Sequence, residues 1–274
     1  MAEIHGTLDR PGCRIHYWLG GPEGAPLVVF THGAICDHHM FDPQVPAVAD
    51  RWRILMWDVR GHGRSQPAST FSTAEAAADL SALIEHCGYT QAVLVGQSMG
   101  GMISQEVVFT YPERVRGLAI VGSSCITLPL TWAEALGLKL SAPLLRMWPY
   151  GPLLRTIASA SGLRRETQAY VRTAASHVSH RDFARIWAGV IMAIHPEPGY
   201  RITCPLLLTH GDQDATGNIR KIAPVWARRD PLCRYEVIPS ARHVANYDNP
   251  ERFNALLIAF LNSLDGHTPM RDRH

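Results

Sequence analysis

The most informative part of the sequence for the fold is Val93-Leu94-Val95-Gly96-Gln97-Ser98-Met99-Gly100-Gly101. An apolar, β-branched run ends in the pattern Gly-x-Ser-x-Gly, and a segment that can form a helix follows at once. The serine is then expected on a tight turn between strand and helix, where a Cβ on either flanking glycine would collide with a neighbouring element. The turn raises the Ser98 hydroxyl above the sheet, with the N–H of Met99 aimed at the same place. A glycine-rich turn without chemistry is the alternative interpretation.

A second oxyanion donor is expected after the run Leu27-Val28-Val29-Phe30. This continuous apolar run is typical of a strand buried on both faces, and it leads into Thr31-His32-Gly33-Ala34. We predict that the N–H of Ala34 forms the oxyanion site together with that of Met99. The alternative is a turn glycine with a histidine that hydrogen-bonds within the loop. Both can hold, because a loop that donates well has to be rigid.

Candidates for the base and the acid follow two later strands. His243 lies in the loop between the last expected strand and the last expected helix, which runs from 250 to 264. A serine hydroxyl becomes a good nucleophile when an imidazole takes its proton, and a carboxylate has to fix the tautomer of that imidazole. Asp212 and Asp214 both follow the strand expected at 205–209, and their spacing does not decide between them. Ser, Asp, His is the chain order that this architecture imposes.

Two further loops carry polar side chains near the expected site. The loop from Cys36 to Phe41 is too polar for a core, so we expect it over the pocket mouth, with His38 and Phe41 touching substrate. The loop Asp58-Val59-Arg60-Gly61-His62-Gly63-Arg64-Ser65 offers Asp58 or His62 as catalytic groups. The favoured interpretation is a glycine-hinged loop held by side-chain hydrogen bonds and an Asp–Arg pairing.

The order of elements predicts an α/β fold with a mostly parallel, doubly wound sheet. An edge hairpin is expected within residues 2–19, and strands and helices then alternate up to residue 125. This alternation breaks between 126 and 200, where the pattern is helical and predicts a cap inserted over the carboxyl edge of the sheet. We therefore assign 1–125 and 201–264 to the core, 126–200 to the cap and 265–274 to a disordered tail. As a set, the cap residues Trp132, Trp148 and Trp187 are expected to line an apolar substrate pocket.

Composition narrows the classes of function. The chain has 274 residues, of which 46% are hydrophobic and 18% charged, and its formal net charge is +2. This balance favours a small molecule as partner over nucleic acid or a membrane, and it leaves the oligomeric state open. The spacing of the histidines and cysteines fits no metal site, so we predict neither a metal nor a cofactor. With no apolar signal core and no bilayer-spanning run, a cytoplasmic protein is expected.

Taken together, these motifs resemble those of the α/β-hydrolase superfamily, in the group with a helical cap. The resemblance runs from Leu27 to Leu264 and rests on motifs that occur in family order: His32-Gly33, Asp58 to Ser65, Gly96 to Gly101, Gly211-Asp212-Gln213-Asp214 and His243. In the family the acid is the last residue of Gly-x-x-Asp, which implies Asp214. The resemblance thus implies a cofactor-independent serine hydrolase of the α/β-hydrolase fold, with Ser98, Asp214 and His243 as its catalytic triad.

The resemblance also bears on the substrate. Outside the cap, the sequence is similar to 3-oxoadipate enol-lactonases, small esterases and cofactor-free haloperoxidases, which implies cleavage of a carboxylic ester or lactone through an acyl-enzyme. Relatives with aspartate at the elbow, such as epoxide hydrolases and dehalogenases, do not match Ser98. Carbon–carbon bond hydrolases usually have tryptophan after the catalytic histidine, where this chain has Val244. Carbon–carbon hydrolysis or perhydrolysis by the same triad stays an alternative, as does a ligand receptor with slow turnover.

Overall fold

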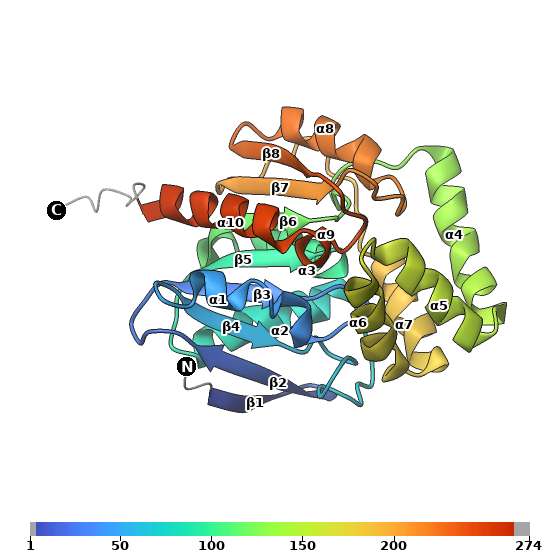
Figure 1. Cartoon of the computed structure of the whole chain (residues 1–274), viewed down its shortest axis with the longest axis horizontal. Helices are drawn as coiled ribbons and strands as arrows, with labels where there is room; N and C mark the ends of the chain where they lie inside the picture. The colour runs from blue at the N-terminus through green and yellow to red at the C-terminus, as the bar shows by residue number, and fades with distance from the viewer. Residues whose placement is uncertain (1–3, 266–274) are drawn as a thin grey trace.

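The computed structural model describes residues 4–265, which form an eight-stranded sheet covered by helices on both faces (Figure 1). The strand order is β1-β2-β4-β3-β5-β6-β7-β8. β1 and β2 form the expected edge hairpin, β2 is antiparallel to β4, and all other neighbours are parallel. The strands are β1 (Ile4–Arg10), β2 (Cys13–Gly20), β3 (Leu27–Thr31), β4 (Arg53–Trp57), β5 (Ala92–Gln97), β6 (Val115–Val121), β7 (Leu206–Gly211) and β8 (Cys233–Ile238). The predicted α/β fold with a mostly parallel sheet is confirmed.

Alternation along the central strands divides the interior into two apolar cores. In β3, Leu27 and Val29 face one core while Val28 and Phe30 face the other, as the two-residue period of a strand requires. The first core packs under α2 (Thr73–His86), α3 (Met99–Thr110) and α8 (Ile219–Arg229), and the second under α1 (Val45–Val48) and α10 (Pro250–Asp265). Burial on both faces explains why these strands read as unbroken apolar runs.

Helix α2 illustrates how local sequence sets an element's ends. The hydroxyl of Ser72 accepts a hydrogen bond from the backbone N–H of Glu75 at 3.1 Å, and the Glu75 carboxylate lies 2.9 Å from that hydroxyl. This side-chain cap satisfies an N–H that has no partner within the helix. Gly88, just beyond the helix, has a φ of 83°, a conformation that glycine adopts without steric cost.

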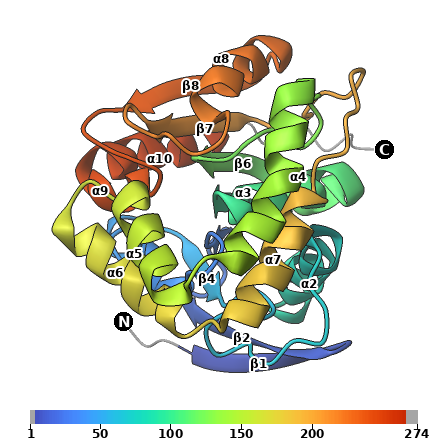
Figure 2. The same cartoon turned by 90° about the vertical axis from the view of Figure 1, so that its right-hand side faces the viewer.

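Between β6 and β7 the chain forms four helices and no strand. They are α4 (Trp132–Met147), α5 (Tyr150–Ser161), α6 (Arg165–Ser176) and α7 (His180–Ile191). Figures 1 and 2 place this helical insertion at one end of the sheet, beyond the ends of the central strands. The division of the chain into core and cap stays a prediction, and the predicted tail lies outside the described residues apart from Asp265, which ends α10. Within residues 4–265, no helix has both the length and the apolar character needed to cross a bilayer.

Candidate active site

Ser98 occupies the turn between β5 and α3 in an unusual backbone conformation. Its φ is 51° and its ψ is −115°, a combination that costs a non-glycine residue energy and is found mostly at functional sites. The flanking glycines make the turn possible. A Cβ on Gly96 would overlap the carbonyl oxygen of Gly100, and a Cβ on Gly100 would overlap that of Thr31 in β3. The collisions expected from the sequence are therefore present in the structure.

The structure brings Ser98, His243 and Asp214 together in one chain of hydrogen bonds. Nε2 of His243 lies 2.9 Å from the Ser98 Oγ, and Nδ1 of the same ring lies 3.0 Å from Oδ2 of Asp214. Because an ionised carboxylate can only accept, Nδ1 carries the proton and Nε2 is left to accept the serine proton. Asp214 is 2% exposed. This is the arrangement in which an imidazole can activate a hydroxyl.

The two neighbouring aspartates, which their spacing left equivalent, have different partners. Asp214 bonds to His243 and also accepts the backbone N–H of Thr216 at 2.9 Å. Burial alone would raise its pKa, but the contact with His243 and the bond from Thr216 outweigh burial and hold the pKa of Asp214 below its ordinary value. Asp212 is exposed and accepts the N–H of Ala241 at 3.0 Å, a bond that lowers its pKa. Asp212 thus bonds to the backbone of the loop that carries His243, while Asp214 contacts the side chain of His243 itself.

The loop after β3 is held rigid by the buried side chain of His32. The N–H of Val59 donates to its Nε2 at 3.0 Å, which leaves Nδ1 to donate to the carbonyl oxygen of Gly33 at 2.8 Å. This bond holds the Gly33 carbonyl on one side, so the N–H of Ala34, in the same trans peptide, is directed to the other. A Cβ on Gly33 would lie 3.4 Å from the Cβ of Ser98. The loop therefore lies beside the serine, and the expected histidine bond within the loop is present.

Gln97, to which no motif in the sequence points, links three parts of the site. It is 1% exposed, and its Nε2 donates to the carbonyl oxygen of His243 at 3.0 Å. Its Oε1 fills the space that a side chain on Gly33 would need. Since Gln97 also directly precedes Ser98, it ties the histidine loop and the loop after β3 to the elbow. The residue stands at the variable position of Gly-x-Ser-x-Gly, so the motif itself gives no hint of this role.

We predict that Gln97→Ala lowers kcat for hydrolysis by about 100-fold and leaves KM within a few-fold. The substitution removes the bond that places the His243 backbone, and a displacement of about 1 Å is enough to cost two orders of magnitude. Steady-state kinetics on a substrate that the wild type turns over would measure both constants. Gln91→Ala, at an exposed residue that donates to the Glu113 carbonyl, is the control. A kcat within twofold of wild type would show that Gln97 does not position the His243 loop for the reaction.

The expectation that the loop from Cys36 to Phe41 is too polar for the core is wrong. Residues His38–Phe41 form the short helix η1, and His38 and Phe41 are 9% and 0% exposed. Asp58 accepts both the backbone N–H and the Nδ1–H of His38, at 2.9 and 2.8 Å, and the ring of Trp18 stacks on the imidazole. With its polar groups satisfied, His38 can be buried. Phe41 packs against Phe30, and burial leaves both residues little surface for the predicted contact with substrate.

The loop from Asp58 to Ser65 is held by side-chain hydrogen bonds, as the favoured interpretation expected. Oδ2 of Asp58 accepts the N–H of Arg64 at 2.7 Å. Burial alone would raise the pKa of Asp58. The hydrogen bonds and the charge of His38 lower this pKa by more than burial raises it, so the net shift is downward. The Asp–Arg pairing that holds this loop joins Arg60 to Asp79 of helix α2, an aspartate outside the loop, at 2.7 Å. Neither Asp58 nor His62 is bonded to the Ser98–His243–Asp214 chain in the described structure.

The three tryptophans expected to line a pocket are not gathered at one place. Trp132 and Trp148, at the two ends of α4, are 80% and 43% exposed. Trp187 lies on α7 and donates from Nε1 to the Ser141 hydroxyl of α4 at 2.8 Å. Their contact with a substrate stays a prediction. Among residues 4–265, no three His, Cys, Asp or Glu side chains are grouped so that they could hold a metal ion.

A buried carboxylate, Asp248, joins the histidine loop to the helical insertion. Its two oxygens accept the backbone N–H groups of Leu163, Arg164 and Arg242 at 2.8 to 3.0 Å. A backbone bond of 2.9 Å from Val244 to Ser161 adds to the connection. The segment between α5 and α6 is therefore fixed beside His243. No pattern in the sequence points to Asp248, because two of its three partners, Leu163 and Arg164, lie about 85 residues away.

His62 adds a pH dependence to stability. It is fully buried, and burial lowers its pKa to about 3 from an ordinary 6.5. The unfolded chain takes up this proton near pH 6.5, whereas the folded chain keeps the ring neutral. We therefore expect stability to be complete above pH 6.5 and to fall with pH, by up to about 1.4 kcal/mol per unit and roughly 4 kcal/mol by pH 3. His32, whose pKa burial also lowers, contributes in the same direction.

Urea unfolding measured from pH 7.5 to pH 4.5 would test this expectation. His62→Gln should reduce the slope of unfolding free energy against pH by about 1.4 kcal/mol per unit below pH 6, whatever it does to stability at neutral pH. His177→Gln, at an exposed residue, is the control and should leave the slope unchanged. Equal slopes in wild type and His62→Gln would contradict the assignment of this pH dependence to His62.

Comparison with known proteins agrees with the fold. A family model described as the alpha/beta hydrolase fold matches residues 26–146. The chain is 24% identical to 3-oxoadipate enol-lactonase 2 of Acinetobacter baylyi, over 90% of this chain and 93% of the relative. It is 29% identical to 3-oxoadipate enol-lactonase 1 of the same bacterium, where the match spans 45% of this chain and only about half, 47%, of the relative.

Solved structures give the same result. An enol-lactonase from Burkholderia xenovorans superposes with a TM-score of 0.80 at 23% identity, covering 94% of this chain and 100% of the other. A thermophilic esterase from Thermogutta terrifontis gives 0.79 at 23% identity, covering 96% and 99%. Likeness at this level of identity establishes the fold. The family match, the strand order and the elbow at Ser98 together identify the α/β-hydrolase fold in this chain.

Proposed function

We propose that this protein is a cofactor-independent serine hydrolase that cleaves a carboxylic ester or a lactone through an acyl-enzyme. The observation that carries the proposal is the continuous hydrogen-bonded chain from Ser98 through His243 to Asp214, at an elbow where Ser98 has a φ of 51°. A hydroxyl bonded to a neutral imidazole whose other nitrogen is held by a carboxylate is the arrangement that generates a serine nucleophile.

In the proposed reaction, Ser98 Oγ attacks the carbonyl carbon while its proton passes to Nε2 of His243. The imidazolium that forms is stabilised by Asp214, which is already ionised and hydrogen-bonded to Nδ1. His243 then gives its proton to the leaving alkoxide as the carbon–oxygen bond breaks. A water molecule, deprotonated by the same Nε2, attacks the acyl-enzyme and releases the acid, and the proton returns to Ser98.

The N–H groups of Ala34 and Met99 are proposed to stabilise the oxyanion. Met99 begins α3, so its N–H is one of the free donors at a helix N-terminus. The Ala34 N–H is aimed by the bond between His32 and the Gly33 carbonyl. Two donors that are already in position before the reaction stabilise the oxyanion more than donors that must reorganise during the reaction.

We further infer that the helical insertion acts as a cap over the site. What supports this is its attachment to the histidine loop, through Asp248 and through the bond from Val244 to Ser161. A cap held in this way excludes water from one side of the acyl-enzyme and limits the shape of the acyl group that can enter.

A substrate panel tests the proposal. The purified protein would be assayed on a short p-nitrophenyl ester, an enol-lactone and a ring-fission diketone, and for perhydrolysis with peroxide. We expect turnover of the ester or the enol-lactone, as the likeness to the Acinetobacter enol-lactonases supports. Turnover confined to the diketone or to peroxide would replace this reaction by another of the same triad. Tight binding without turnover of any compound would indicate a receptor.

A further inference from the structure

Helix α4 has two apolar faces, and only one of them is packed. Leu138, Ser141 and Leu145 lie on the packed face against α7. Ser141 accepts the Trp187 Nε1–H at 2.8 Å, and the His180 imidazole lies 3.1 Å from the carbonyl oxygen of Leu145. These bonds fix the orientation of α4, which Figure 2 shows running beside α7 along the insertion.

The opposite side of α4 presents a continuous apolar stripe to solvent. Its residues recur every three or four positions, which places them on one face of a helix, and they are 47% to 81% exposed. We call this set the exposed α4 face: Trp132, Leu136, Leu140, Leu144 and Met147. Because α4 is fixed to α7 through its other side, the exposed α4 face cannot turn inward without breaking those bonds. Contiguous apolar surface of this kind usually marks a binding surface.

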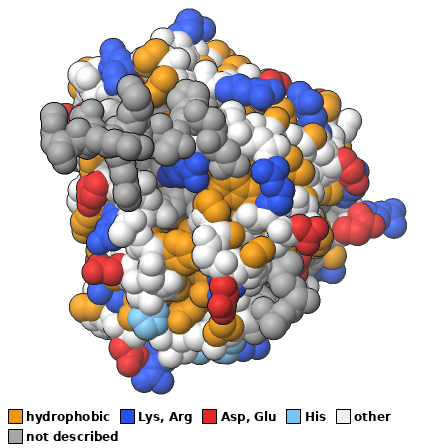
Figure 3. All heavy atoms as spheres, turned by 90° about the vertical axis from the view of Figure 1, so that its left-hand side faces the viewer, with side chains coloured by type: hydrophobic (Ala, Val, Ile, Leu, Met, Phe, Trp, Pro, Cys, Tyr) orange, Lys and Arg blue, Asp and Glu red, His pale blue; other side chains and the backbone are white. Residues whose placement is uncertain are grey.

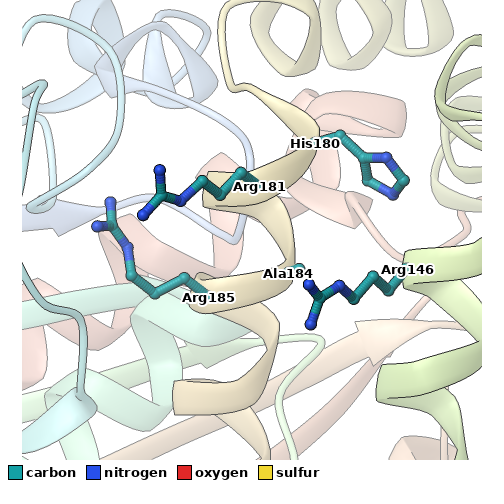
Figure 4. A pocket seen from close by; sticks show the side chains of 5 residues that line it. All are labelled: Arg146, His180, Arg181, Ala184 and Arg185. Atoms are coloured by element: carbon teal, nitrogen blue, oxygen red, sulfur yellow. The ribbon is translucent and has the colours of Figure 1, made fainter.

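Cationic side chains border this stripe along one edge. Lys139 and Arg146 lie on α4 beside the exposed face, and Arg146 also lines an open pocket of about 510 Å³ together with His180, Arg181, Ala184 and Arg185 of α7. Figure 4 shows the Arg146 guanidinium reaching from α4 toward Ala184. Arg185 is paired with Asp182 at 2.8 Å. Within residues 4–265, Lys139, Arg146 and Arg181 form no ion pair with a carboxylate.

Charge is unevenly distributed along the chain. Residues 126–200 contain eight Lys or Arg and four Asp or Glu, and residues 135–165 contain five Lys or Arg with no acidic residue at all. At the opposite end of the molecule, acidic and basic side chains are interspersed (Figure 3). The whole-chain charge of +2 averages over this difference, which is why composition alone favoured no membrane partner.

We propose that the exposed α4 face docks on an anionic phospholipid surface, with the apolar side chains among the acyl chains and phosphate head groups at Arg146 and Arg181. A helix with an apolar face, tryptophan at its ends and a basic edge has the features of an interfacial helix. A second copy of the chain fits less well. A symmetric interface over this stripe would bring the unpaired cations of the two copies toward one another, whereas anionic head groups neutralise them.

Vesicle co-sedimentation tests the proposal, with Ser98→Ala protein so that any lipid hydrolysis does not interfere. The vesicles are phosphatidylcholine alone, or an equimolar mixture with phosphatidylglycerol. We expect binding to the mixed vesicles, weakened by salt, and much weaker binding to phosphatidylcholine. The double variant R146Q/R181Q should lower the partition coefficient about 30-fold. The triple variant L136Q/L140Q/L144Q should lower it by on the order of 10²- to 10³-fold.

Matched controls come from α8 and the turn after it, outside the insertion. R220Q/R228Q removes two exposed cations and V225Q/L232Q two exposed apolar side chains, and both should bind as the parent does. Circular dichroism would verify folding of every variant. No binding to the mixed vesicles, or equal binding to both kinds, would overturn the proposal. So would a dimer in sedimentation velocity that L136Q/L140Q/L144Q abolishes without any vesicle binding, because it would assign the face to a second copy.

Discussion

Ser98→Ala is expected to lower kcat/KM for ester or lactone hydrolysis by about 10⁴- to 10⁶-fold, the largest effect in the molecule. The alanine leaves His243 and Asp214 in place but removes the atom that we propose forms the acyl-enzyme. The Oγ that is lost makes one hydrogen bond in the site, to His243 at 2.9 Å, so the fold should be kept. Steady-state kinetics with substrate in excess, together with a thermal melt, would measure both parts of this expectation.

The control for this variant is Ser176→Ala, at an exposed serine of α6. It should retain wild-type kinetics. His243→Ala and Asp214→Ala test the other two members of the proposed triad. If the three groups act together as proposed, the losses of these variants should not add to that of Ser98→Ala. A Ser98→Ala enzyme that keeps even a tenth of wild-type activity, free of contaminating hydrolase, would exclude Ser98 as the nucleophile.

Asp79→Ala is expected to destabilise the protein by about 3–5 kcal/mol. Asp79 is 1% exposed at its side chain and accepts from Arg60 Nε at 2.7 Å, from Arg60 Nη2 at 3.0 Å and from Arg10 Nε at 3.0 Å. Arg60, 3% exposed, would lose its main partner and keep only Glu75, at 2.8 Å. Urea unfolding followed by circular dichroism would give the free energy of unfolding.

The chain offers a matched control, an Asp–Arg pair with the same N–O distance but with exposed side chains. Asp9 and Arg14 also lie 2.7 Å apart, but their side chains are 77% and 65% exposed. Asp9→Ala should therefore cost less than about 1 kcal/mol, because solvent already screens the pair. Replacing both buried partners, as R60M/D79L, should recover much of the loss, since no charge is then left buried alone. Equal losses for Asp79→Ala and Asp9→Ala would contradict the role given to burial.

Local patterns were enough to predict the elements and the elbow. The two-residue alternation and continuous apolar runs located the strands, because burial on one or both faces selects those patterns directly. The Gly-x-Ser-x-Gly motif is likewise selected by a local constraint. Gly96 and Gly100 are required by backbone atoms that approach within the turn itself and from β3, a constraint that leaves its mark on the sequence.

Features that depend on distant partners were not predictable in the same way. The loop from Cys36 to Phe41 was misjudged because Asp58, about twenty residues later, satisfies His38 and allows its burial. Spacing could not choose between Asp212 and Asp214, since the choice depends on how the loop turns toward His243. Asp248 bonds to residues about 85 positions away, and Gln97 stands where the motif allows any residue. Long-range polar contacts of this kind leave no periodic signal.

The solvent exposure of the exposed α4 face could not be predicted from the sequence either. Its apolar period was visible in the sequence and predicted a helix, but a helix with apolar residues on both sides reads like a fully buried one. Only the structure reveals that Trp132 and Met147 are 80% and 81% exposed.

The most direct test of the proposed nucleophilic site is reaction with a fluorophosphonate, followed by peptide mapping in a mass spectrometer. We expect a single covalent adduct on the Ser98 hydroxyl, formed rapidly in wild type, at a rate at least 10³-fold lower in His243→Ala and not at all in Ser98→Ala. Failure of the folded wild-type protein to react, or an adduct mapped to another residue, would contradict the claim that Ser98, His243 and Asp214 form a working nucleophilic site.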